Sequence, residues 1–134
     1  MSQHYRIAVA ALALLAALAV ACGDSTDTAV LETVAPEQAA DVLAENPDAI
    51  LLDIRTPEEF ASERIAGAEN VDFYAADFAD QLAAFDRSET YVVYCRSGNR
   101  TAAAMDVFAD LGFEVVYEVD GGIVNWVSSG LPLS

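Results

Sequence analysis

The sequence predicts an α/β domain in which helices cover both faces of a parallel β-sheet. Two observations carry this prediction. Residues 49–54 (AILLDI) and 91–94 (YVVY) are short, continuous apolar runs, as expected of strands that are buried on both faces. The segments around these runs carry apolar residues at helical spacing, so strands alternate with helices along the chain.

The first elements can be placed from their end signals. Residues 30–34 are expected to form a short edge strand. A helix is predicted to begin at Pro36 and to stop before the Asn-Pro pair at residues 46–47. After the apolar run at 49–54, Thr56 is the predicted N-cap of a second helix, and Glu59 reaches back as its partner in a capping box.

The later elements follow the same alternation. We expect a short strand within residues 65–71, a helix over 73–85, the strand at 91–94, a helix running to about residue 111, a strand at 115–117 and a short helix over 123–129. Gly112 fits the C-cap of the fourth helix. Trp126 is expected in the core.

The polar loop after the strand at 91–94 is the most informative stretch. Cys95 opens this loop, which leads into a helix, so backbone N–H groups and the positive end of the helix dipole converge near the thiol. Arg96 and Arg100 add full positive charge. These features favour the thiolate, and we expect Cys95 to be a nucleophile. The alternative is that Cys95 is an inert core cysteine. The polar sequence RSGNR that follows it argues against this alternative, because such residues are rarely buried in a core.

Composition excludes several kinds of chemistry. His4 is the only histidine and precedes the domain, so the domain lacks a Ser-His-Asp triad, a Cys-His pair and a histidine metal ligand. With Cys22 and Cys95 as the only cysteines, we expect no metal and no cofactor. The formal net charge of −16 disfavours nucleic acid and anionic lipid headgroups as partners.

The N-terminal segment resembles a bacterial lipoprotein signal. Residues 7–21 form a 15-residue apolar run, too short to span a bilayer, and small residues lead directly into Cys22. We predict a signal peptide at 1–21, lipidation of Cys22, a tether at 22–29 and the folded domain at 30–134. The protein would be exported and lipid-anchored, at the outer face of the cell membrane or at a periplasmic or outer membrane. Plain secretion and an uncleaved anchor are the alternatives.

Four blocks of sequence occur together in a recognisable order. They are residues 51–55 (LLDIR) with 58–60 (EEF), residues 65–70 (IAGAEN), residues 94–100 (YCRSGNR), and residues 121–123 (GGI) with Trp126 and 131–132 (LP). Together they resemble a single-domain rhodanese, a sulfurtransferase. One departure is Glu63-Arg64, where the family commonly has Gly-His, at a position that is usually structural.

The resemblance implies a function. Cys95 would take a sulfane sulfur from thiosulfate or a related small anionic donor, hold it as a persulfide, and pass it to cyanide or a thiol acceptor. Asp53 and Arg55 would support the site, as a structural pair more than in catalysis. The chain is expected to act as a monomer. The residues implied to bind the donor are Arg96, Ser97, Gly98, Asn99, Arg100 and Thr101.

Two other functions remain open on the sequence. A related fold hydrolyses phosphate esters with a cysteine-to-arginine loop, but such loops enclose five residues, whereas Cys95 and Arg100 enclose four. The shorter loop favours sulfur chemistry. A non-catalytic sulfide-binding or sulfur-carrier module would use the same loop.

Overall fold

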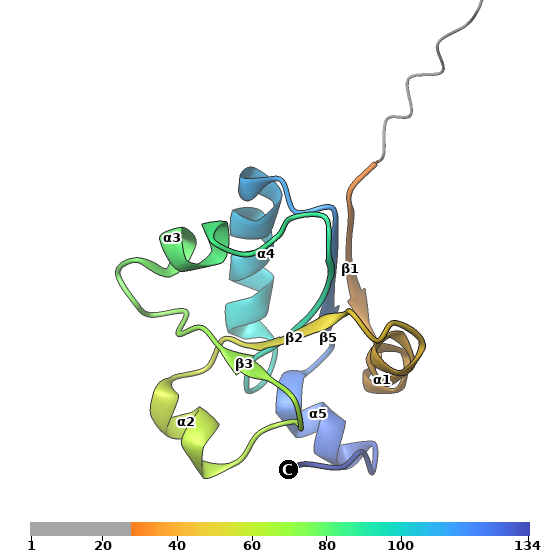
Figure 1. The fold of residues 1–134 in the computed structure, drawn as a ribbon. Coiled ribbons are helices and arrows are strands. Elements are labelled where there is room, and N and C mark those ends of the chain that lie inside the picture. Colours follow the sequence, from red (N-terminus) through yellow and green to blue (C-terminus); the bar gives the residue numbers. More distant parts are fainter. Residues whose placement is uncertain (1–27) are drawn as a thin grey trace, which may run out of the picture.

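Five strands form a single sheet in which every neighbouring pair is parallel (Figure 1). The computed structural model describes residues 28–134, so the predicted signal, Cys22 and most of the tether lie outside the described residues. In spatial order the strands are β1 (Val30–Val34), β5 (Val115–Val119), β4 (Thr90–Tyr94), β2 (Ile50–Asp53) and β3 (Glu69–Asn70). The predicted edge position of residues 30–34 is confirmed.

Helices lie on both faces of this sheet. They are α1 (Pro36–Glu45), α2 (Pro57–Ser62), α3 (Phe78–Ala83), α4 (Asn99–Leu111) and α5 (Gly122–Ser128). Helices α1 and α5 pack on one face, and α3 and α4 pack on the other (Figure 1). The predicted fold class is therefore confirmed. Across the described residues, no helix has the length and apolar character needed to cross a bilayer.

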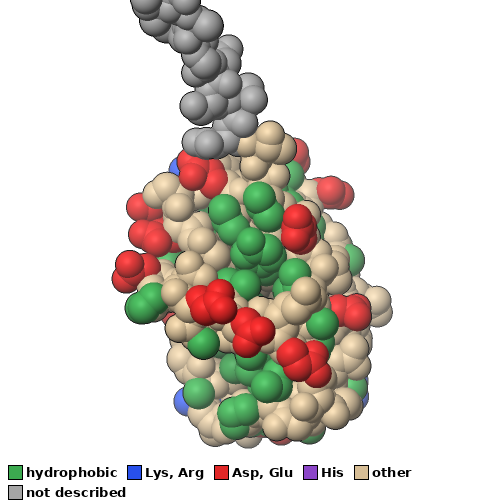
Figure 2. All heavy atoms as spheres, turned by 90° about the vertical axis from the view of Figure 1, so that its right-hand side faces the viewer, with side chains coloured by type: hydrophobic (Ala, Val, Ile, Leu, Met, Phe, Trp, Pro, Cys, Tyr) green, Lys and Arg blue, Asp and Glu red, His purple; other side chains and the backbone are tan. Residues whose placement is uncertain are grey.

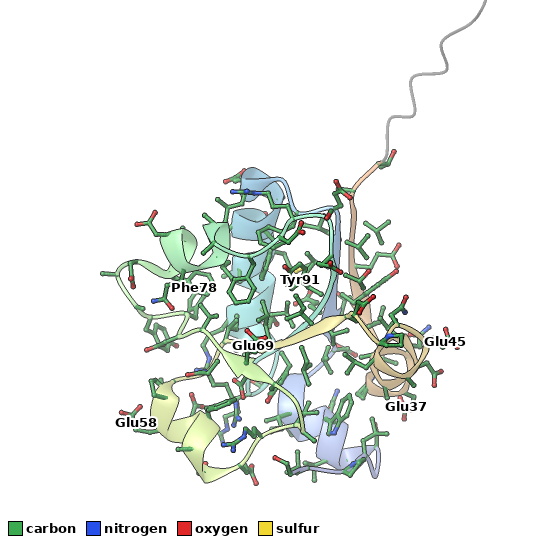
Figure 3. The ribbon with its side chains drawn as sticks, viewed as in Figure 1. Glu37, Glu45, Glu58, Glu69, Phe78 and Tyr91 are labelled. Atoms are coloured by element: carbon green, nitrogen blue, oxygen red, sulfur yellow. The ribbon has the colours of Figure 1, made fainter. Side chains whose placement is uncertain are left out.

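Strand β4 supplies side chains to both cores because successive residues of a strand point to opposite faces. Tyr91 and Val93 pack with α3 and α4, whereas Val92 and Tyr94 pack with α1 and α5. All four side chains are fully buried. Figure 3 shows Tyr91 in the interior of the molecule. The central strand is thereby held from both sides, and the loop that follows it starts from a fixed point.

The predicted helix ends are largely confirmed. The Glu59 backbone N–H donates to Thr56 Oγ1 at 3.3 Å, and the Thr56 N–H donates to Glu59 Oε2 at 3.0 Å, which completes the capping box. Gly112 adopts a left-handed conformation with φ of 82° at the end of α4. Trp126 is buried, and its indole N–H donates to the Pro132 carbonyl.

The predicted helix over residues 73–85 is wrong at its start, because α3 begins only at Phe78. The Phe73 N–H donates to the Ile54 carbonyl and so extends the pairing beside β2. The Asp72 carboxylate then accepts the Tyr74 N–H at 2.9 Å, which closes a local turn. Because of these hydrogen bonds, the backbone N–H groups of Phe73 and Tyr74 are held by acceptors that do not belong to a helix. Helical spacing of the apolar residues did not reveal this competition.

The first turn of α5 is attached to the loop after β4. The Ile123 N–H donates to the Cys95 carbonyl at 2.9 Å, and the Val124 N–H donates to the Arg96 carbonyl at 3.2 Å. Gly122 makes this close approach possible. Its φ is +60°, and a Cβ atom there would collide with the Cys95 carbonyl oxygen and lie 2.6 Å from that of Arg96. The start of α5 therefore determines the orientation of two loop peptides.

This attachment predicts a position-specific effect of alanine. Gly122→Ala should lower the free energy of unfolding through left-handed strain of about 1–2 kcal/mol and an added clash of about 1–3 kcal/mol. It should also displace the loop and change the rate at which Cys95 reacts with a thiol reagent. Chemical denaturation and reagent kinetics measure the two effects.

Gly130→Ala is the matched control. Gly130 also has a positive φ, of +77°, but nothing lies within 4 Å of a Cβ atom built there. This variant should show the strain alone and leave Cys95 reactivity unchanged. Equal effects of the two substitutions would show that the contact between α5 and the loop is unimportant.

Candidate active site

The predicted site lies at the carboxyl edge of the sheet, where parallel α/β sheets bind their ligands. Strand β4 ends at Tyr94 and strand β2 ends at Asp53, and these two residues are paired in the sheet. Cys95 is the next residue after β4. The topology therefore brings the loop after β4 next to the segment that follows β2, although some 40 residues separate them in the sequence.

The Cys95 thiol lies at the base of this loop. Its residue is only 1% exposed, and Sγ accepts the Gly98 N–H at 3.1 Å. Gly98 has a φ of 100°, a left-handed conformation that turns this amide back toward the sulfur. The Thr101 hydroxyl lies 3.8 Å from Sγ and donates to the Gly98 carbonyl at 3.0 Å. The buried sulfur thus has one backbone donor and one neighbouring hydroxyl group.

Further loop amides face away from α5. The Cys95 and Arg96 carbonyls accept hydrogen bonds from α5, and in a trans peptide the N–H points opposite to the C=O. The N–H groups of Arg96 and Ser97 therefore point away from α5, and neither has an acceptor among the described residues. Unpaired backbone donors on successive residues are the kind of groups that build anion-binding concavities.

A pocket of about 410 Å³ opens over the thiol. It is lined by Thr56, Glu59, Tyr74, Cys95, Arg96, Ser97, Asn99 and Arg100. We call this the thiol pocket. Five of the seven predicted loop residues line it, and the other two, Gly98 and Thr101, lie directly against the sulfur. The structure therefore brings all of the predicted loop residues together.

The charge of Arg100 is balanced within the protein. Its guanidinium donates to both carboxylate oxygens of Glu59, at 2.7 and 3.0 Å, and lies 5.6 Å from the centre of the Tyr74 ring. The hydrogen bond from Arg100, with further ones from Thr56, lowers the pKa of Glu59 to about 2. The ion pair therefore persists at neutral pH. Sequence reasoning assigned Glu59 to helix capping alone and missed this pair, because 41 residues separate the partners.

Arg96 differs from Arg100 in this respect. It is exposed at the mouth of the thiol pocket, and its guanidinium has no hydrogen bond, ion pair or ring contact within residues 28–134. The other four arginines in that range all have such partners; they are Arg55, Arg64, Arg87 and Arg100. Arg96 is consequently the uncommitted cation beside Cys95.

Asp53 and Arg55 form a buried ion pair, as the sequence predicted. The Arg55 guanidinium donates to Asp53 Oδ2 at 2.6 Å and to the Glu63 carbonyl at 2.6 Å, and both residues are at most 3% exposed. The pair connects the end of β2 to the end of α2. No buried side-chain nitrogen or oxygen among the described residues lacks a hydrogen-bond partner, those of this pair included. The pair fixes the segment beside the thiol pocket.

The rest of the surface is strongly acidic. Figure 2 shows many acidic and few basic side chains on the face that carries α1 and β1. Glu37, Glu45 and Glu58 lie at the outside of the molecule (Figure 3). Among residues 28–134, no group of three or more histidine, cysteine, aspartate or glutamate side chains is arranged to hold a metal ion. An anion that approaches the thiol pocket therefore meets long-range repulsion before it meets local attraction.

Comparison with known proteins agrees with this arrangement. A family model described as a rhodanese-like domain matches residues 35–129. The thiosulfate sulfurtransferase GlpE of Pseudomonas aeruginosa (strain LESB58) is 40% identical over 97 residues, which cover 72% of this chain and 84% of that protein. A sulfurtransferase of Allochromatium vinosum is 33% identical over 91 residues, or 68% of this chain and 83% of that protein.

Solved structures share the same fold. A rhodanese-related protein from Thermoplasma volcanium superposes with a TM-score of 0.65 at 29% identity, covering 77% of this chain and 97% of that one. The polysulfide-sulfur transferase homodimer of Wolinella succinogenes gives a TM-score of 0.63 at 27% identity, covering 81% of this chain and 79% of that one. The chain therefore belongs to the rhodanese-like domain family and is a rhodanese-type enzyme.

Proposed function

We propose that this sulfurtransferase moves a sulfane sulfur from thiosulfate, or a related small anionic donor, to a thiol or cyanide through a persulfide on Cys95. The main support for this proposal is that the Cys95 Sγ atom is buried at the base of a pocket and accepts a hydrogen bond from the Gly98 amide at 3.1 Å. Similarity to proteins named as thiosulfate sulfurtransferases supports the choice of donor.

The first step is attack by the Cys95 thiolate on the outer sulfur of thiosulfate. A bond forms between Sγ and that sulfur, and the sulfur–sulfur bond of thiosulfate breaks. The electron pair of the broken bond leaves with sulfite, and the enzyme keeps an anionic persulfide. In the second step the acceptor attacks the outer sulfur, and the electron pair of the breaking bond returns to Sγ as the thiolate.

Hydrogen-bond donors and a positive charge of the loop can stabilise the negative charges of the persulfide and of the leaving sulfite. The outer persulfide sulfur is anionic, and the unpaired N–H groups of Arg96 and Ser97 are donors that could receive it. The free Arg96 guanidinium is suited to the sulfonate end of the donor and to the departing sulfite. The loop can therefore favour both the covalent intermediate and its formation.

Two features argue against phosphate ester hydrolysis. The loop encloses four residues between Cys95 and Arg100, one fewer than phosphatase loops of a related fold. In addition, Arg100 is engaged by Glu59 through both of its carboxylate oxygens. The arginine that would grip a phosphoryl group is thus already paired.

The covalent step is tested by mass spectrometry. After treatment with thiosulfate, the protein should gain the mass of one sulfur on Cys95, and cyanide should remove it with release of thiocyanate. Cys95→Ser should show neither event, because a hydroxyl group cannot carry the sulfur. A stable added sulfur that no acceptor removes would instead support the sulfur-carrier alternative, and no added sulfur at all would refute the proposed donor.

Arg96 and the acidic surface should act in opposite directions on thiosulfate capture. Arg96→Ala should slow capture about tenfold or more, as expected for loss of a charged hydrogen bond worth about 1.5–3 kcal/mol. Moderate salt should speed capture by the wild type, because a Debye length of about 10 Å at 0.1 M screens distant repulsion more than close attraction. Stopped-flow measurement of sulfite release across ionic strength checks both effects.

Arg87→Ala is the matched control for charge. It changes the net charge equally, but Arg87 is bound to the Leu111 carbonyl at the far end of α4. This variant should capture thiosulfate at close to the wild-type rate. Capture that falls steadily from the lowest salt upward would show that the acidic surface has no influence.

We also propose that Cys22 is lipidated and that the lipid anchors the exported protein to a membrane. The support comes from sequence: the apolar run at 7–21, the small residues before Cys22 and the acidic, polar segment after it. In bacterial cells the wild type and Cys95→Ser should remain in the membrane fraction after an alkaline wash. Cys22→Ser should be released or left unprocessed while its domain stays active. A freely soluble wild-type protein with unmodified Cys22 would contradict the anchor.

A further inference from the structure

A second pocket, of about 600 Å³, adjoins the thiol pocket. We propose that this second pocket binds the carbon body of the sulfur acceptor, an uncharged organic thiol with an apolar side. The inference rests on the sulfurtransferase function proposed above and adds the class of acceptor. The lining residues come from α2, the segments that flank it, the loop after β4 and α5: Arg55, Glu59, Ser62, Glu63, Arg96, Ile123, Val124, Val127 and Ser128. We call this the acceptor pocket.

The two pockets share a boundary. Glu59 and Arg96 line both of them, whereas Cys95 lines only the thiol pocket. Glu59 is held in place by Arg100, but the Arg96 side chain has no partner within the described part of the chain. A thiol group that extends from the acceptor pocket past Arg96 would meet the outer sulfur of a persulfide on Cys95. Donor and acceptor can thus use different surfaces around one sulfur.

Size and surface chemistry favour an organic molecule here. Thiosulfate and cyanide are far smaller than this pocket, whose volume is typical of sites for small organic ligands. Val124 and Val127 on α5 are 48% and 50% exposed. Together with Tyr74 they are the large exposed hydrophobic side chains of the described residues, and Tyr74 lines the thiol pocket. All three of these exposed hydrophobic side chains therefore line one of the two pockets.

The charges that line the pocket do not favour a strongly anionic acceptor, because Arg96 is the only unpaired cation among the lining residues and is shared with the thiol pocket. The Ser62 and Ser128 hydroxyls donate to the Glu59 and Val124 carbonyls, so their oxygens remain as acceptors, and Glu63 adds a carboxylate to the lining residues. The Arg55 guanidinium is committed to Asp53. In addition, the 22 acidic residues of the chain repel anions at long range. An uncharged thiol whose apolar side lies on α5 fits these groups best.

The test separates the second half-reaction from the first. Full-length protein is loaded with sulfur by thiosulfate, freed of donor, and mixed with benzyl mercaptan, 2-mercaptoethanol or cyanide. The two thiols have similar acidity and differ mainly in their carbon body. Benzyl mercaptan should discharge the persulfide with saturation at low concentration, whereas 2-mercaptoethanol should need a much higher concentration.

Val127→Thr keeps the shape of the side chain and replaces one methyl group by a hydroxyl. It should raise the half-saturating concentration of benzyl mercaptan about three- to fivefold, the amount expected for one lost apolar group. Thiosulfate capture and discharge to cyanide should not change. Val127→Leu, which stays apolar, should retain tight use of benzyl mercaptan.

The outcomes distinguish the two proposals. Failure of thiosulfate to load Cys95 would overturn the sulfurtransferase mechanism itself. Normal loading, followed by equal use of the two thiols and no effect of Val127→Thr, would overturn only the acceptor pocket. A change in all three reactions together would assign Val127 a structural role and likewise contradict the inference.

Discussion

Two hydrogen bonds from the first turn of α5 to the carbonyls of Cys95 and Arg96 determine how the active loop is presented. They turn these carbonyls away from the thiol pocket and leave the opposite N–H groups free for a ligand. Only a residue without a Cβ atom permits the contact, and Gly122 supplies it. The sheet fixes the start of the loop at the end of β4, and α5 fixes its course. The orientation of these N–H groups thus depends on an element that follows the loop by more than 20 residues.

The site uses its few positive charges selectively. Arg55 and Arg100 are paired with carboxylates and stabilise the walls, while Arg96 remains free at the junction of two pockets. A buried paired charge fixes structure, whereas an exposed free charge can bind a ligand. This division leaves the loop with one unpaired cation in an acidic protein. A single unpaired cation is compatible with an enzyme that must bind an anionic donor and then release anionic sulfite.

Much of this could be predicted from the sequence, for local reasons. Continuous apolar runs identified β2 and β4. The start of α2 was also predictable, because the Thr56 cap and its partner Glu59 lie within four consecutive residues. The loop from Cys95 onward was recognisable because its polar sequence follows a buried strand. The pair between Glu59 and Arg100 and the contact of α5 with the loop depend on tertiary packing. No local sequence pattern predicts these two contacts. The late start of α3 was missed for the same reason, because it depends on hydrogen bonds to other parts of the fold.

The central claim is that loop amides oriented by α5 hold the outer sulfur of a Cys95 persulfide. The most direct test is a high-resolution crystal structure of the thiosulfate-treated protein. We predict one additional sulfur bonded to Sγ, within hydrogen-bonding distance of the backbone N–H groups of Arg96 and Ser97. An added sulfur that points into solvent, away from these amides, would contradict the account.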